Sequence, residues 1–119
     1  MSYVQGFLLA VRADQRETYR RHAAAAWPVF QRLGCLSAEE NWGVDVQPGE
    51  VTSFPQAVKL EEGEVVVFSW MVWPDRATCD AAWARMMSEP ELMEGMGEMP
   101  FDGRRMMWGG FEPLFSAGA

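Results

Sequence analysis

Two stretches of the chain are apolar on both faces of a predicted strand. In residues 3–11, YVQGFLLAV, apolar side chains occupy odd and even positions alike. Residues 64–73, EVVVFSWMVW, show the same pattern and carry the strongest strand signal in the chain. Because successive side chains of a strand point to opposite faces, both strands require apolar cover on both faces.

A helical pattern follows the first strand. Asp14 and Glu17 have the spacing of a capping box, which predicts that the helix begins there. Pro28 is expected to kink this helix, and Gly34 is well placed to end it. Its inward stripe, at helical spacing, consists of Tyr19, Ala23, Ala26, Phe30 and Leu33.

The second strong strand is also followed by a helix. Asp75 is the expected cap, Pro90 interrupts the helix, and residues 91–96 are expected to add one more turn. Residues 35–46 predict a more polar strand that lies nearer a sheet edge, and residues 47–63 a loop or irregular hairpin. The last predicted strand spans 104–112, with a bulge or close approach at Gly109-Gly110. The buried stripe of the second helix is expected to consist of Cys79, Ala82, Trp83, Met86 and Met87.

This order of elements, βαββαβ, predicts an α+β, ferredoxin-like protomer in one domain over residues 1–119. Its two helices cover only one face of a four-stranded antiparallel sheet. The other face is also apolar, and leaving it in water would expose a larger patch than a soluble monomer tolerates. A second copy related by a two-fold axis is the simplest cover, so we expect a homodimer.

The composition narrows the classes of function. A formal net charge of −7 argues against a generic grip on nucleic acid or on an anionic membrane surface. No apolar stretch approaches the ~20 residues of a membrane span, and the start of the chain lacks a signal-peptide pattern, so a cytoplasmic protein is expected. Cys35 and Cys79 are expected to be free thiols. The spacing of ligand-type residues predicts no metal and no cofactor.

Four motifs resemble the YbaA-like family of small bacterial proteins, which is classed as a domain of unknown function. They are YVQGF (Tyr3 to Phe7), VTSFPQAVKL (Val51 to Leu60), VVFSWMVWPDRATCD (Val66 to Asp80) and MPFDGRRMMWGGFEPL (Met99 to Leu114). The resemblance implies a ferredoxin-like protomer of the dimeric α/β-barrel superfamily. It implies no reaction, since that superfamily includes cofactor-free monooxygenases, haem-degrading enzymes, lactone isomerases and stress-response proteins.

Four residues are candidates for a ligand pocket between the sheet and the first helix. Tyr19 and His22 are the polar-tipped groups on the inward side of that helix, and Trp70 is expected to face them from the sheet. Arg105 would add a charge at the rim. His22 is alternatively a general base, an axial ligand to haem, or a helix-edge residue with a structural role. The tryptophans either line a pocket or pack in the core and the dimer, and Arg105 is alternatively a salt-bridge residue.

Two functions follow from this set. The first is a homodimer that binds a small, flat, hydrophobic molecule without catalysis. The second is a cofactor-independent enzyme, similar to a monooxygenase or isomerase, that acts on a small aromatic substrate. The two differ in whether His22, Trp70 and an arginine converge on one cavity.

Overall fold

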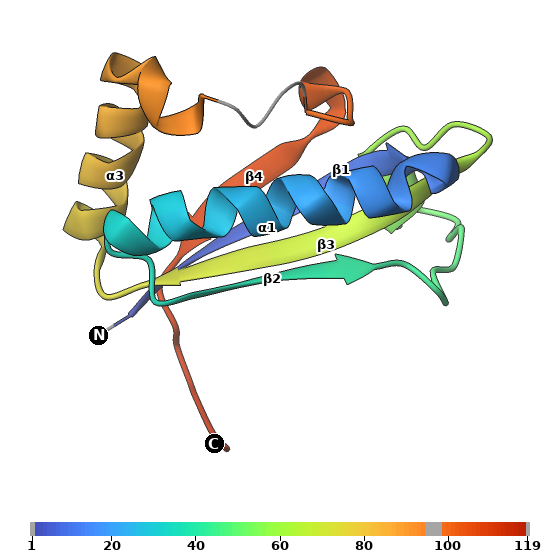
Figure 1. Cartoon of the computed structure of the whole chain (residues 1–119). Helices are drawn as coiled ribbons and strands as arrows, with labels where there is room; N and C mark the ends of the chain where they lie inside the picture. Colours follow the sequence, from blue (N-terminus) through green and yellow to red (C-terminus); the bar gives the residue numbers. More distant parts are fainter. Residues whose placement is uncertain (1, 95–98, 119) are drawn as a thin grey trace.

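Four strands form one antiparallel sheet, and the two long helices lie on one side of it (Figure 1). The computed structural model describes residues 2–94 and 99–118. The strands are β1 (Tyr3–Arg12), β2 (Ser37–Trp42), β3 (Glu64–Trp73) and β4 (Met107–Phe111). The helices are α1 (Arg16–Arg32), α2 (Phe54–Ala57) and α3 (Arg76–Ser88), with 3-10 turns η1 (Ala13–Gln15), η2 (Pro90–Met93) and η3 (Gly103–Arg105). The predicted α+β, ferredoxin-like class is confirmed.

The sheet order is β2-β3-β1-β4, so the two strands with apolar residues on both faces occupy its centre. β1 and β3 pair from Tyr3↔Trp73 to Arg12↔Glu64. Odd-numbered residues of both strands face the helices, as Leu9 and Val67 do in one cluster with Tyr19 of α1. We call this the helix-side face and the opposite one the outer face. Both faces of β1 and β3 carry apolar side chains, as the sequence predicts.

The helix-side core is large and aromatic. Trp73 is fully buried and lies edge-on to Phe30, with 6.4 Å between ring centroids. The outer face has its own small core at one end, where the chain between β2 and β3 folds back over it. There Leu8, Ala10 and Val66 pack with Val58 and with the partly buried Val46 and Leu60. The remainder of the outer face has no such cover within the described residues.

The beginning of the first helix differs from the prediction. Asp14 does not cap it, because its carboxylate accepts hydrogen bonds from Arg12 and the chain forms the 3-10 turn η1 first. α1 begins at Arg16 and continues through Pro28 to Arg32. Gly34 follows its end with φ of 108°, a left-handed conformation that favours glycine, so that prediction is confirmed.

The boundaries of the other elements agree with the sequence prediction in part. Asp75 caps α3 as predicted, because its side chain accepts a hydrogen bond from the backbone N–H of Thr78. The last strand begins at residue 107 rather than 104, because the Asp102 side chain caps the 3-10 turn η3. The second strand is limited to 37–42, and the predicted loop 47–63 contains the short helix α2, which is capped by Ser53.

The extra turn predicted over 91–96 exists in part. Pro90–Met93 forms η2, while residues 95 and 96 lie outside the described residues. Among the helices of the described residues, none combines the length and apolarity that crossing a bilayer requires.

Candidate functional site

A row of four side chains crosses the helix-side face from edge to edge. Glu40 of β2 pairs with Ser69 of β3, Ser69 pairs with Phe7 of β1, and Phe7 pairs with Trp108 of β4. Directly paired residues of an antiparallel sheet lie on the same face. The row therefore places a carboxyl and a hydroxyl at one end and two aromatic rings at the other, and we call it the transverse row.

The polar end of the transverse row is bound by α1. The Tyr19 hydroxyl donates a hydrogen bond of 2.5 Å to Oε1 of Glu40. Tyr19 is buried, and its ring meets Phe101 edge-on at 6.0 Å between centroids. Burial raises the pKa of Tyr19 well above its ordinary value, and the neighbouring Glu40 adds to the rise. The phenol therefore stays protonated and remains a donor.

Glu40 is the titratable group of this cluster. The residue as a whole is exposed, since β2 is an edge strand. Burial of the carboxyl group nevertheless raises the pKa of Glu40, whereas hydrogen bonds from Tyr19 and Ser69 lower it. A carboxyl with a raised pKa beside a protonated phenol is able to accept or return a proton. Ser69 is buried at 3% exposure, in the middle of an otherwise apolar strand surface.

A second buried polar group lies on the same face. The Gln5 side chain is 5% exposed, and its Oε1 accepts hydrogen bonds from the indole N–H groups of Trp73 (3.0 Å) and Trp83 (2.9 Å). Each indole donor thus has a partner in a core that would otherwise leave it unpaired. This network fixes two large rings and accounts for two tryptophans as structural residues.

His22 lies on α1 three residues after Tyr19 and is half-buried. Partial burial lowers its pKa, so the imidazole is neutral at neutral pH. Its predicted place near Tyr19 on this helix is consistent with the structure, whereas its proposed role remains a prediction.

The predicted position of Trp70 is wrong. Trp70 is paired with Gly6 and Glu39, on the outer face, and its ring contacts Phe68 at 5.5 Å between centroids. It cannot form a wall opposite Tyr19, because the sheet separates them. The prediction placed Trp70 on the wrong face of β3. α1 packs against the odd-numbered residues of this strand, and Trp70 is even-numbered.

Arg105 serves as an internal anchor. Its guanidinium forms two 2.7 Å hydrogen bonds with the carboxylate of Glu64, and it also binds Asp102 and the carbonyl of Lys59. Both members of the main pair are largely buried, with side-chain exposures of 16% and 8%. The guanidinium hydrogen bonds lower the pKa of Glu64. Arg105 therefore ties η3 to the start of β3, and no charge is left for a pocket rim.

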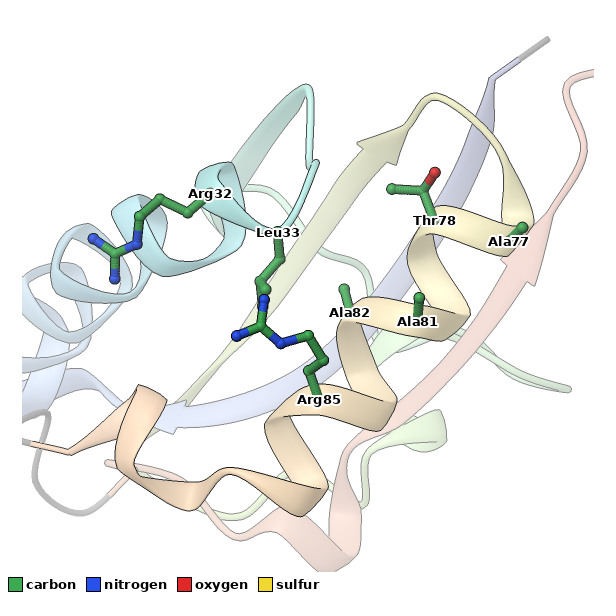
Figure 2. A pocket seen from close by; sticks show the side chains of 7 residues that line it. All are labelled: Arg32, Leu33, Ala77, Thr78, Ala81, Ala82 and Arg85. Atoms are coloured by element: carbon green, nitrogen blue, oxygen red, sulfur yellow. The ribbon is translucent and has the colours of Figure 1, made fainter.

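An open groove of about 400 Å³ lies elsewhere, between the end of α1 and α3 (Figure 2). Figure 2 shows two arginines at one end of it and Thr78 with Ala77 at the other. Arg85 is already paired with Glu89 at 2.9 Å. Its lining consists of Arg32, Leu33, Ala77, Thr78, Ala81, Ala82 and Arg85, which includes none of the four predicted site residues.

The structure thus brings Tyr19 and His22 to one helix and leaves Trp70 and Arg105 elsewhere. Sequence reasoning missed Glu40, Ser69 and Trp108 as a set. A signal existed for Ser69, since it is the one hydroxyl within the apolar run 64–73. No set of three or more metal-ligating side chains occurs within residues 2–94 and 99–118.

The family model described as "Protein of unknown function (DUF1428)" matches residues 2–103. The chain belongs to this family. It is 50% identical over 114 residues to the Escherichia coli K12 protein named "Uncharacterized protein YbaA", covering 96% of this chain and 97% of that one. A Shigella flexneri protein of the same name matches to the same extent. The resemblance in the four motifs is therefore confirmed.

Solved structures resemble the fold at low sequence identity. A dimeric ferredoxin-like protein from an uncultured marine organism has a TM-score of 0.59 at 12% identity, over 98% of this chain and 100% of that one. SnoaB, a cofactor-independent oxygenase from Streptomyces nogalater, has a TM-score of 0.56 at 13% identity, over 97% and 95% of the two chains. Both likenesses support the fold of this DUF1428 protein.

Proposed function

We propose that this protein is a homodimer that binds a small, flat, mostly apolar molecule on the helix-side face of each sheet. The transverse row is the observation that carries the proposal. Its aromatic end offers an accessible stacking surface at Trp108, which is 66% exposed and lies beside the half-buried Phe7. An exposed aromatic surface of this kind suits a small, flat, apolar ligand.

The outer face supports the homodimer. Its aromatic side chains form a contact series in which Phe54 meets Phe68 at 6.0 Å and Phe68 meets Trp70 at 5.5 Å between centroids. Phe68 is 46% exposed and Phe111 is 61% exposed. Glu39 at the β2 edge adds a polar rim. An apolar centre with a polar rim is typical of a protein interface, and a second copy supplies the same surface by symmetry.

The ligand is argued from the aromatic end of the transverse row. Phe7 is half-buried and Trp108 is mostly exposed, on the same face as the Tyr19–Glu40 pair. A large indole on an edge strand offers a flat surface on which an aromatic ligand can stack. Glu40 lies three strand spacings, about 14 Å, across the sheet from Trp108, so a small ring system stacked on Trp108 does not reach its carboxyl. The net charge of −7 disfavours an anionic ligand, so the chemistry favours a neutral aromatic molecule.

The test is a calorimetric titration with 1-naphthol and, in parallel, 1-naphthoic acid. We expect the alcohol to bind and the acid to bind at least about tenfold more weakly. Trp108→Ala is expected to weaken binding of the alcohol about tenfold, because the stacking surface is lost. The melting temperature should change little, because Trp108 is mostly exposed.

Met87→Ala is the matched control. The prediction that Met87 belongs to the buried stripe of helix α3 is wrong, since Met87 is 85% exposed. Met87 is not part of the transverse row, so the change removes an exposed apolar side chain without touching the site. It should leave naphthol binding unchanged. Equal affinity of the parent protein and the Trp108→Ala variant would contradict the proposed site.

The Tyr19–Glu40 pair favours a second candidate, a cofactor-independent oxygenase or isomerase that acts on the same class of aromatic molecule. Glu40, with its raised pKa, would take a proton from the substrate while Tyr19 holds the carboxylate in place. The likeness in fold to a cofactor-independent oxygenase supports this candidate. Glu40→Gln separates the two functions. It should retain ligand stacking but abolish any turnover of naphthol in air. Mass spectrometry of the products measures this turnover.

A further inference from the structure

The end of the chain carries two apolar side chains that its own protomer does not cover. Residues 112–118 follow β4, and we call them the C-terminal arm. Within the arm Leu114 is 101% exposed and Phe115 is 85% exposed. Isolated exposed apolar residues are ordinary, but two adjacent large ones on a segment that leaves the fold form a contact surface that lacks a partner.

The arm points to the side of the sheet where the second copy is proposed to lie. Figure 1 shows it running away from the sheet on the side opposite α1. The last residue of β4, Phe111, is paired with Val4 on the outer face and is 61% exposed, so the apolar outer face extends to the residue that precedes the arm. Pro113 lacks a backbone N–H and favours an extended course.

The reach of the arm suits this geometry. An extended chain advances roughly 3.3 Å per residue, so Leu114, where the backbone bends, lies at most about 10 Å from Phe111. Two sheets packed face to face are also about 10 Å apart. An arm that leaves one outer face is therefore long enough for Leu114 and Phe115 to reach the opposite sheet.

We infer that the C-terminal arm of each protomer docks on the second copy, with Leu114 and Phe115 packed against the apolar border of its outer face. The contact is reciprocal, because the two-fold axis that relates the protomers gives each copy both an arm and a border. This inference rests on the proposed homodimer and adds a second, separable part to its interface. It assigns the arm a role in holding the two copies together.

The test compares the dimer dissociation constant of the full chain with that of the double variant Leu114→Ser/Phe115→Ser, by sedimentation equilibrium. We expect the dissociation constant to rise at least about tenfold, since two arms lose their apolar contacts in each dimer. The melting temperature of the protomer should not change, because both residues are exposed. Met87→Ser is the matched control, since it removes an apolar side chain that is 85% exposed on α3.

A second measurement reads the contact directly. Protein with photoreactive benzoyl-phenylalanine in place of Phe115 is mixed with unlabelled protein and illuminated. We expect cross-links between the two chains, and we expect their yield to fall when the unlabelled protein carries Phe68→Glu. An unchanged dissociation constant for the double variant, with cross-links only within one chain, would overturn the inference and leave the dimer itself standing. A monomeric parent protein would contradict the homodimer as well, so the two failures are distinguishable.

Discussion

Replacing Trp73 by alanine is expected to lower the free energy of unfolding by about 3–5 kcal/mol, the largest effect of any single truncation proposed for this chain. Trp73 has no exposed surface, packs edge-on against Phe30 and donates its indole N–H to Gln5. The change leaves a cavity and removes one of the two donors that satisfy the buried Gln5 carbonyl. Chemical denaturation followed by circular dichroism measures it.

Trp108→Ala provides the control for that experiment. It makes the same chemical change on the same face of the sheet, but at a position that is 66% exposed. The expected loss is about 0.5 kcal/mol or less, as for most surface substitutions. If the two variants were equally destabilised, the helix-side core would not be centred on Trp73.

The second large effect is expected from Phe68→Glu, which should convert the dimer into a monomer at micromolar concentration. Phe68 lies at the middle of the outer-face aromatic series, between Phe54 and Trp70. In the proposed dimer the substitution places a carboxylate from each copy in an apolar interface, where charge burial is costly. Phe68 is 46% exposed in the protomer, so folding should survive.

Size exclusion with light scattering measures that change in mass. Met87→Glu is the matched control, because it introduces the same charge at an exposed apolar position on α3. It should leave the mass at that of the parent. If Phe68→Glu also kept the parent's mass while remaining folded, the outer face would not be the dimer interface.

The backbone pattern was readable from the sequence because it depends on local spacing. Period-two apolar runs located β1 and β3, and Asp75 and Gly34 marked helix ends through chemistry that acts over one turn. The failures were also local. Asp14 had a nearer partner in Arg12 than in the helix backbone, and Asp102 converted the expected start of the last strand into a 3-10 turn.

The site was harder to predict because it depends on which face of the sheet the helices cover. Both faces of β3 are apolar, so hydrophobicity alone did not show whether Trp70 or Ser69 faces α1. The role of Arg105 was equally undetermined by the sequence, because its partner Glu64 is 41 residues away. Long-range pairings of this kind, like the one between Tyr19 and Glu40, require the fold before they are visible.

The two faces of the sheet divide the proposed roles. The helix-side face holds two buried polar groups, Ser69 and Gln5, and the edge residue Glu40, which is hydrogen-bonded to Tyr19. The outer face is apolar at its centre, and within the described residues only α2 and the chain next to it cover one end of it. The proposed ligand site and the proposed dimer interface therefore use different side chains, and variants on one face should leave the other role intact.

The most direct test of this account is the mass of the unmodified protein in dilute solution, measured by light scattering after size exclusion at micromolar concentration. The account predicts a single species of twice the 13.4 kDa chain mass. A single species at the chain mass itself would contradict it, because the apolar outer face would then be stable in water without a partner.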